Sequence, residues 1–119
     1  MPKRVLIADD NPMIRRLLCR MLEEQAHYEV CAEAANGAEA IELAKKELPD
    51  LIIMDASMPI LDGISAALEL KNLFPHLPII LFTQHADAIR QSIDLPVDHV
   101  VSKNDSASLM RYVYALAPV

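Results

Sequence analysis

The stretch that decides the fold runs from Leu51 to Pro59 and reads LIIMDASMP. Its first four residues are all apolar, which predicts a strand that is buried on both faces, as strands of parallel sheets are. Asp55 follows directly, so its carboxylate stands at the end of that strand. Ligands of open α/β sheets bind at this edge. We therefore interpret Asp55 as a nucleophile that accepts a phosphoryl group.

Outward from this stretch, further short apolar runs predict strands along the whole chain. The predicted strands are residues 3–8, 28–34, 51–54, 79–82 and 97–101. Apolar residues alternate with polar ones only in the second run, at Tyr28, Val30, Ala32 and Ala34. Alternation indicates a strand with one solvated face, so we place this strand at an edge of the sheet.

A helix is predicted after each strand. Asn11-Pro12 provides a capping side chain and a proline at the first helical position, and Asn36 with Glu39 resembles a capping box. A third helix is expected to follow the turn at residues 58–63 and to end near Phe74, and Asn104-Asp105 is expected to cap the last one.

The apolar spacing in these segments predicts which side chains face the core. The expected inward residues are Ile14, Leu17, Leu18, Met21 and Leu22 in the first helix, Ile41, Ala44 and Leu48 in the second, and Leu109, Tyr112, Val113 and Leu116 in the last. The fourth helix, between Ala86 and Ser92, has support only from Ile89 and Ile93, so we expect it to be short.

This alternation predicts the α/β class: a five-stranded parallel sheet of order 2-1-3-4-5 flanked by five helices, which is the flavodoxin-like doubly wound fold. The chain has 119 residues, which is the size of one domain, so we expect residues 1–119 to form a single domain.

Composition excludes several classes of function. The chain has only 2 glycines, which argues against a glycine-rich phosphate loop, and its net charge of -6 argues against direct binding of nucleic acid. It contains neither an apolar run of about 20 residues nor a secretion signal, so we expect no membrane association. Cys19 and Cys31 show no metal-binding or redox spacing. These features favour a cytoplasmic protein.

Polar groups follow four of the predicted strands: Asp9-Asp10, Asp55, Thr83 and Lys103. Because parallel strands share one carboxyl edge, we expect these side chains to converge there. Carboxylates that crowd together repel one another unless a cation intervenes, and Mg²⁺ prefers oxygen ligands of this kind. The metal, Lys103 and Thr83 could then hold the three oxygens of a phosphoryl group while Asp55 attacks it.

These residues resemble the receiver domains of two-component response regulators, and the resemblance extends from Val5 to Leu116. It rests on Asp9-Asp10, on the segment Asp55 to Gly63, on Thr83 and on Lys103. It implies Mg²⁺ held by Asp10, Asp55 and the backbone carbonyl of Ser57, with Asp9 in support. It also implies a histidine kinase or a phosphotransfer protein as donor. The domain would be a switch that catalyses its own phosphorylation and dephosphorylation, and not an enzyme with a diffusible substrate.

The sequence departs from the family pattern at three positions. Asn104 follows the lysine where the family usually has proline, and Val100 stands where the family often has an aromatic residue. Gln84 follows Thr83 where a small residue is common, which narrows access to the phosphoryl site. The switch mechanism of the family therefore does not transfer directly to this chain.

Three alternatives remain open at this stage. A phosphohydrolase of the haloacid dehalogenase kind also uses an aspartate at a strand end, but Ser57 stands where its second acid is needed. A flavin-binding module shares the topology, but Asp9-Asp10 would repel the flavin phosphate. A degenerate receiver that only binds protein partners is supported by the departures named above.

The sequence identifies neither the cognate kinase nor the output. No effector follows Val119, so we expect a stand-alone receiver or a segment of a longer regulator. Output through an attached effector domain, output through a separate target protein, and dimerisation on phosphorylation are all compatible with the sequence.

Overall fold

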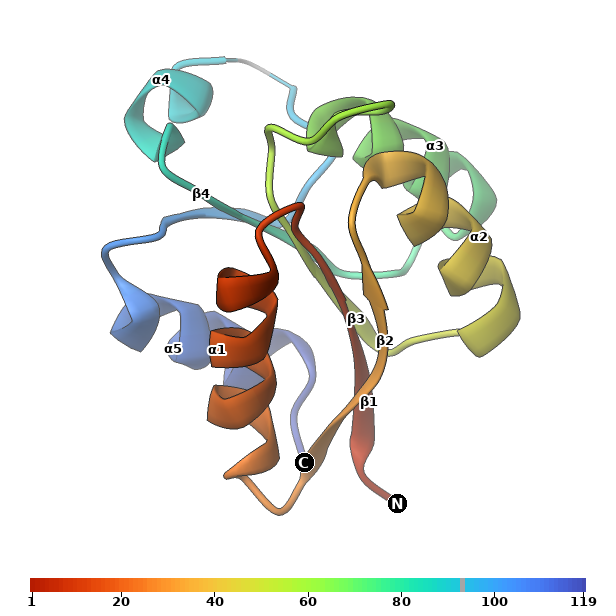
Figure 1. Ribbon diagram of the computed structural model, residues 1–119, viewed down its shortest axis with the longest axis vertical. Helices are drawn as coiled ribbons and strands as arrows, with labels where there is room; N and C mark the ends of the chain where they lie inside the picture. Colours follow the sequence, from red (N-terminus) through yellow and green to blue (C-terminus); the bar gives the residue numbers. More distant parts are fainter. Residues whose placement is uncertain (93) are drawn as a thin grey trace.

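The computed structural model describes residues 1–92 and 94–119 as a three-layered α/β domain (Figure 1). The strands are β1 (Lys3–Ala8), β2 (Tyr28–Ala34), β3 (Leu51–Met54), β4 (Ile79–Thr83) and β5 (His99–Ser102). The helices are α1 (Pro12–Glu23), α2 (Gly37–Glu47), α3 (Gly63–Leu73), α4 (Ala86–Arg90) and α5 (Ser106–Leu116). All strand pairs are parallel and the order is β2-β1-β3-β4-β5, which confirms the predicted fold class.

Two apolar cores lie on opposite faces of the sheet. On one face Leu18 and Leu22 of α1 pack with Leu109 and Val113 of α5. On the other face α2 and α3 bury mostly small side chains, with Leu70 as the largest that is fully enclosed. In Figure 1 both chain termini lie at the end of the sheet opposite the carboxyl edge, which leaves that edge clear.

Burial follows the predicted difference between the central strands and β2. Every residue of β3 and β4 is buried, whereas β2 exposes Glu29 and Glu33 and lies at an edge. The simple alternation predicted for β2 is wrong at one point. Val5 pairs with Val30 but Leu6 pairs with Ala32, so β2 contains one extra residue. This bulge reverses which face the following side chains occupy.

Two of the predicted inward side chains are exposed. Leu17 is 48% exposed because α1 contacts the sheet with a stripe around Leu18 and Leu22, which is narrower than the apolar pattern of its sequence. Leu48 is 64% exposed because it ends α2 in the left-handed conformation, with a φ of 49°, and so leaves the helical face.

The fifth strand begins later than predicted and ends one residue later. Val97 and Asp98 precede β5. The carboxylate of Asp98 accepts a hydrogen bond from the backbone N–H of Ile79 (2.8 Å) and pairs with Lys71 (2.8 Å), which ties this segment to β4 and α3. The predicted short fourth helix is confirmed as α4. Ile89 packs against the core as expected, and Ile93 lies outside the described residues. None of the helices in the described part of the chain is long and apolar enough to cross a bilayer.

The connection from β3 to α3 folds back tightly against the end of β3. The backbone N–H of Gly63 donates to the carbonyl of Ala56 (2.9 Å). A Cβ at residue 63 would lie 1.9 Å from the backbone oxygen of Asp55, so a side chain there requires the backbone to move. Gly63 is therefore needed for the path of the loop beside Asp55.

We predict that Gly63→Ala destabilises the domain by roughly 1–3 kcal/mol, the usual effect of overpacking a buried site. Without a clash, alanine in a helix would instead stabilise it by about 1 kcal/mol relative to glycine. Urea unfolding measures the difference. Asn72→Ala on the exposed side of the same helix is the control, and it should not destabilise. A Gly63→Ala variant as stable as the parent protein would contradict the steric argument.

Candidate functional site

Asp55 stands where β3 leaves the centre of the sheet. Its backbone N–H donates to the carbonyl of Ala8 (2.9 Å), which extends the β1–β3 pairing by one residue and fixes the aspartate. The side chain is buried, and the residue retains only 7% of its accessible surface. The structure therefore presents Asp55 at the carboxyl edge, as the sequence predicted.

The acidic pair that follows β1 lies beside it. Asp9 is buried, and its Oδ1 accepts a hydrogen bond from the backbone N–H of Asn11 (2.9 Å), whereas Asp10 is exposed. Carboxylate oxygens of Asp9, Asp10 and Asp55 all lie within 4.8 Å of one another. Two ligands of one Mg²⁺ ion, each at about 2.1 Å, are at most about 4.2 Å apart. A small inward movement of the carboxylates would bring this oxygen-only set into range of one ion.

Lys103 follows β5 and reaches both buried acids. Its Nζ lies 2.8 Å from Oδ2 of Asp9 and 3.3 Å from Oδ2 of Asp55. Its backbone N–H donates to the carbonyl of Thr83 (3.0 Å), so the lysine is anchored to the end of β4. Three carboxylates face one ammonium group, and the two negative charges left over equal the charge of a divalent cation.

The pKa values of both Asp55 and Lys103 are raised, for different reasons. Burial raises the pKa of Asp55, and the negative charge of Asp9 adds to this, although the Lys103 ammonium opposes both. Burial alone would lower the pKa of Lys103, but the hydrogen bond to Asp9 and the charges of both acids raise it. The lysine therefore stays charged, while Asp55 holds its negative charge against a cost.

Thr83 is placed at the same edge but below the surface. It is fully buried, and its hydroxyl accepts a hydrogen bond from the backbone N–H of His85 (3.1 Å). A depression of about 290 Å³ at this edge is lined in part by Gln84 and His85, the two residues that follow Thr83, and not by Thr83 itself. Ser57, the remaining predicted residue, also lines this depression, and its N–H lies 3.4 Å from Oδ1 of Asp55.

The predicted site residues thus gather at one edge, where the three carboxylates lie close together and Lys103 pairs with two of them, Asp9 and Asp55. Sequence reasoning did not assign Asn11 and His85 to the site, although both line the depression. The signal for Asn11 was its position directly after the acidic pair. The signal for His85 was its position two residues after Thr83, although a single histidine without ligand spacing does not by itself indicate a site.

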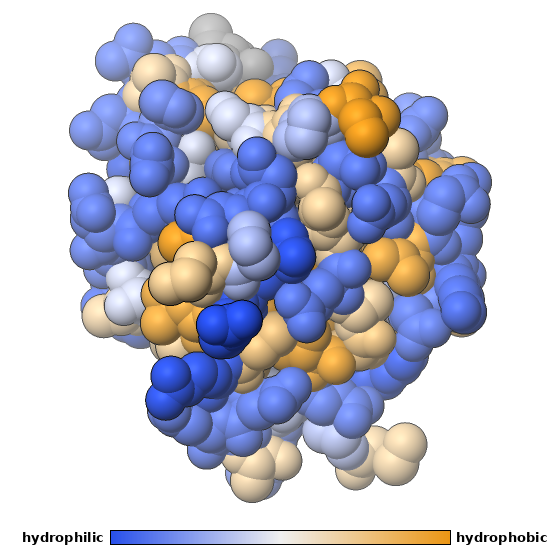
Figure 2. Space-filling view, in the orientation of Figure 1, coloured by the Kyte–Doolittle hydropathy of each residue, from blue (hydrophilic) through white to orange (hydrophobic). Residues whose placement is uncertain are grey.

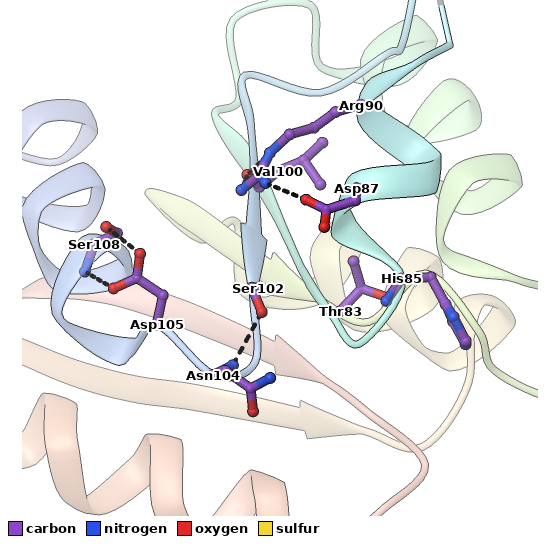
Figure 3. A network of polar contacts seen from close by, with 9 residues as sticks. All are labelled: Thr83, His85, Asp87, Arg90, Val100, Ser102, Asn104, Asp105 and Ser108. Atoms are coloured by element: carbon purple, nitrogen blue, oxygen red, sulfur yellow. Dashed lines mark hydrogen bonds and ion pairs between the residues drawn. The ribbon is translucent and has the colours of Figure 1, made fainter.

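Several separate polar contacts lie on the α4–β5–α5 side of the domain, next to this edge (Figure 3). The guanidinium group of Arg90 donates to the backbone carbonyl of Val100 through Nη2 (2.7 Å) and Nε (3.1 Å), which ties α4 to β5. The backbone N–H of Asn104 donates to the hydroxyl of Ser102 (3.2 Å). A proline at residue 104 could not make this bond.

Comparison with known proteins identifies the family of this site. The chain has a doubly wound α/β fold with an acidic cluster at the carboxyl edge of its sheet. The family model described as the response regulator receiver domain matches residues 5–114. The chain therefore belongs to the response regulator receiver domain family, the signalling domains of two-component systems.

Relatives and solved structures agree with this assignment. The transcriptional regulatory protein PdtaR of Mycobacterium tuberculosis is 45% identical over 95 residues, which cover 78% of this chain and 45% of PdtaR. Chemotaxis protein CheY of Halobacterium salinarum is 38% identical over 105 residues, which cover 87% of this chain and 86% of CheY. The chain spans less than half the length of several curated relatives that it matches.

Among solved structures, the response regulator TrrA of Thermotoga maritima in complex with Mg²⁺ and BeF is similar, with a TM-score of 0.87. It is 33% identical, and the match covers 96% of this chain and 98% of TrrA. A LuxR-family response regulator of Aurantimonas sp. matches with a TM-score of 0.88 and 30% identity, over 98% of this chain and 86% of that one.

The raised pKa of Asp55 predicts a pH-dependent gain in stability for Asp55→Asn in the absence of metal. The folded state keeps the proton to higher pH than the unfolded chain, so native Asp55 is most favourable below the unfolded pKa of about 3.9 and loses stability as pH rises through the folded pKa. The variant should therefore be more stable than the parent at neutral pH, and the difference should shrink as pH falls towards that value. Urea unfolding with a chelator measures it.

Asp62→Asn is the matched control. Hydrogen bonds from Ser65 lower the pKa of Asp62, so ionised Asp62 stabilises the native state above the unfolded pKa. This variant should not gain stability at neutral pH. A loss of stability in Asp55→Asn at neutral pH would contradict the account of the cluster.

We further predict that Arg90→Ala loosens α4. Loss of a charge-assisted hydrogen bond of this kind costs about 1.5 kcal/mol, so the amides of α4 should exchange with solvent roughly tenfold faster. Hydrogen exchange read by nuclear magnetic resonance measures this, with the amide of Ile89 as a reporter because it donates to the carbonyl of His85, the residue before α4. Asp87→Asn removes only the exposed ion pair of Arg90 and should leave exchange nearly unchanged. Equal exchange in both variants would show that Arg90 does not hold the helix.

Proposed function

We propose that this receiver domain is a phosphorylation-dependent switch in which Asp55 accepts a phosphoryl group from a histidine kinase or phosphotransfer protein. The observation that supports it most is the position of Asp55, which is buried at the end of the central strand and flanked by two acids and Lys103. A carboxylate oxygen of Asp55 attacks phosphorus, the bond between phosphorus and the donor breaks with its electrons going to the donor, and an acyl phosphate remains.

The proposal includes a Mg²⁺ ion held by Asp10, Asp55 and the backbone carbonyl of Ser57, with Asp9 in support. The close approach of three carboxylate oxygens and their excess of two negative charges suit such an ion. When bound, it would neutralise charge on the phosphoryl oxygens. The complex of similar TrrA with Mg²⁺ and BeF is consistent with this.

Lys103 and Thr83 have separate roles in the proposed reaction. Lys103 already pairs with Asp55, so its ammonium is in place to contact an oxygen of the transferred group. The hydroxyl of Thr83 now accepts a hydrogen bond at the start of α4. Turning this hydroxyl to the phosphoryl group would give up that bond, so phosphorylation at Asp55 would change the attachment of α4. The change would reach partners through α4, β5 and α5.

For the donor protein, the proposal assigns the exposed face of α1 beside the acidic pair. Figure 2 shows hydrophobic and strongly hydrophilic side chains next to one another over this helix. Met13 is 68% exposed and Leu17 is 48% exposed, and Arg16 and Arg20 lie beside them. Residues 1–119 act as one receiver domain in this proposal, and its output passes to an attached effector domain or to a separate target protein.

The switch is preferred to the alternatives considered from sequence. The family assignment argues against a phosphohydrolase and against a flavin-binding module. A degenerate receiver is not favoured, because the acids and the lysine of the site lie within reach of one another. We propose that the domain catalyses its own phosphorylation and dephosphorylation and does not turn over a diffusible substrate.

The proposal predicts that the protein gains the mass of one phosphoryl group when incubated with a small-molecule phosphodonor and Mg²⁺. Asp55→Asn should show no gain, because an amide is a far weaker nucleophile, and a chelator should prevent the gain in the parent protein. Intact-mass spectrometry measures both.

Asp62→Asn alters an exposed carboxylate in the loop after Asp55 and should still gain one group. A phosphoryl group retained by Asp55→Asn would show that another residue is the acceptor. No gain in the parent protein with any donor would favour the degenerate receiver.

A further inference from the structure

Arg15 connects the acidic pair to two elements of the fold. It lies in the first turns of α1, and its Nη1 donates to the backbone carbonyl oxygen of Asp9 (2.6 Å). Its Nε donates to the carboxylate of Glu33 near the end of β2 (3.3 Å). The side chain is mostly covered, at 21% exposed. One guanidinium group therefore joins the end of β1 to the end of β2.

With this bond, every polar atom of Asp9 has a partner. Its backbone N–H donates to the carbonyl of Ala34 (3.0 Å), Oδ1 accepts from Asn11, and Oδ2 pairs with Lys103. Arg15 supplies the remaining bond, to the backbone oxygen. Asp9 is therefore held on all sides, and its carbonyl can turn only if Arg15 releases it.

Fixing this carbonyl also fixes Asp10. The carbonyl of Asp9 and the N–H of Asp10 belong to one planar peptide unit, so their directions cannot change independently. The side chain of Asp10 is exposed and has no ion pair among the described residues. Its carboxylate nevertheless lies with those of Asp9 and Asp55. The direction of the peptide between Asp9 and Asp10 therefore limits where the Asp10 carboxylate can lie.

We propose that Arg15 is a positioning residue for the divalent cation, and that it acts by locking the Asp9–Asp10 peptide so that three carboxylates converge. This inference rests on the proposed function, because it presumes that the cluster binds Mg²⁺. The forked guanidinium suits the role, since separate N–H groups serve the carbonyl of Asp9 and the carboxylate of Glu33.

Electrostatics alone makes the opposite prediction. A positive charge near the acids repels a divalent cation, so removing it should strengthen Mg²⁺ binding. Loss of the positioning bond should weaken binding. The sign of the change therefore separates the two effects.

The test measures Mg²⁺ affinity of the full chain by isothermal titration calorimetry, with Mg²⁺ alone as the probe. Arg15→Gln should weaken binding at least fivefold, although it removes a repelling charge. Arg16→Gln removes the same charge from the next residue, whose side chain is exposed and has no ion pair in the described part of the chain. This control should bind as tightly as the parent or slightly more tightly. Arg15→Gln behaving like Arg16→Gln would overturn the proposal.

A conservative pair covers the case in which Arg15→Gln does not fold, which thermal unfolding would reveal. Arg15→Lys keeps the charge, but a single ammonium group cannot replace both guanidinium N–H groups that contact Asp9 and Glu33. This variant should bind Mg²⁺ two- to fivefold more weakly than the parent. Arg16→Lys is its control and should bind as tightly as the parent. Equal affinities in this pair would also overturn the role of Arg15. Absence of Mg²⁺ binding in the parent protein would instead refute the metal site itself and this inference with it, and Asp10→Asn serves as the reference for that outcome.

Discussion

The carboxyl edge of the sheet depends on one mostly covered ammonium group that is shared between two buried carboxylates. Lys103 follows β5, Asp9 follows β1 and Asp55 follows β3, so this contact joins the ends of three strands. Burying a charge is costly unless it is paired, and here the single positive charge does not balance the acids around it. The edge of the sheet is therefore stable enough to form and still has an affinity for positive charge. A site that binds a cation and then a phosphoryl group needs both properties.

The two sides of Asp55 are built differently. On the α1 side, Asp9 is held by bonds to Ala34, Asn11, Arg15 and Lys103, so that part of the site is rigid. On the α4 side, the short helix is attached through the hydroxyl of Thr83 and through the bond from Arg90 to Val100. Ala86 is buried and Ile89 packs against the core, but α4 has only 5 residues, so the exchange of one polar contact would change a large part of its attachment. In the proposed switch, the rigid α1 side would therefore position the ligands, and the α4 side would change its contacts and pass on the signal.

Sequence reasoning predicted the strands, their order and the place of the site, because buried parallel strands leave a strong apolar signal and their ends share one edge. It was wrong about Leu17 and Leu48, because an apolar pattern does not tell how wide a stripe the sheet can cover or where a helix leaves its axis. It did not predict the bonds that Arg15 makes to Asp9 and Glu33. The bonds of Arg15 join residues from three elements, and only the folded chain brings these together.

The bulge in β2 decides on which face of the sheet the last residues of that strand lie. Side chains of a strand alternate, so Val30 and Glu33 would lie on opposite faces if the pairing were regular. The extra residue between them changes an odd step into an even one, and Glu33 comes to lie on the face covered by α1, beside Arg15. The bulge, and not the composition of β2, thus places Glu33 on the same face of the sheet as Arg15. A protein engineer could therefore remove the bulged residue and keep Glu33 on the α1 face, whereas pairing all 7 residues of β2 regularly would send Glu33 to the opposite face of the sheet.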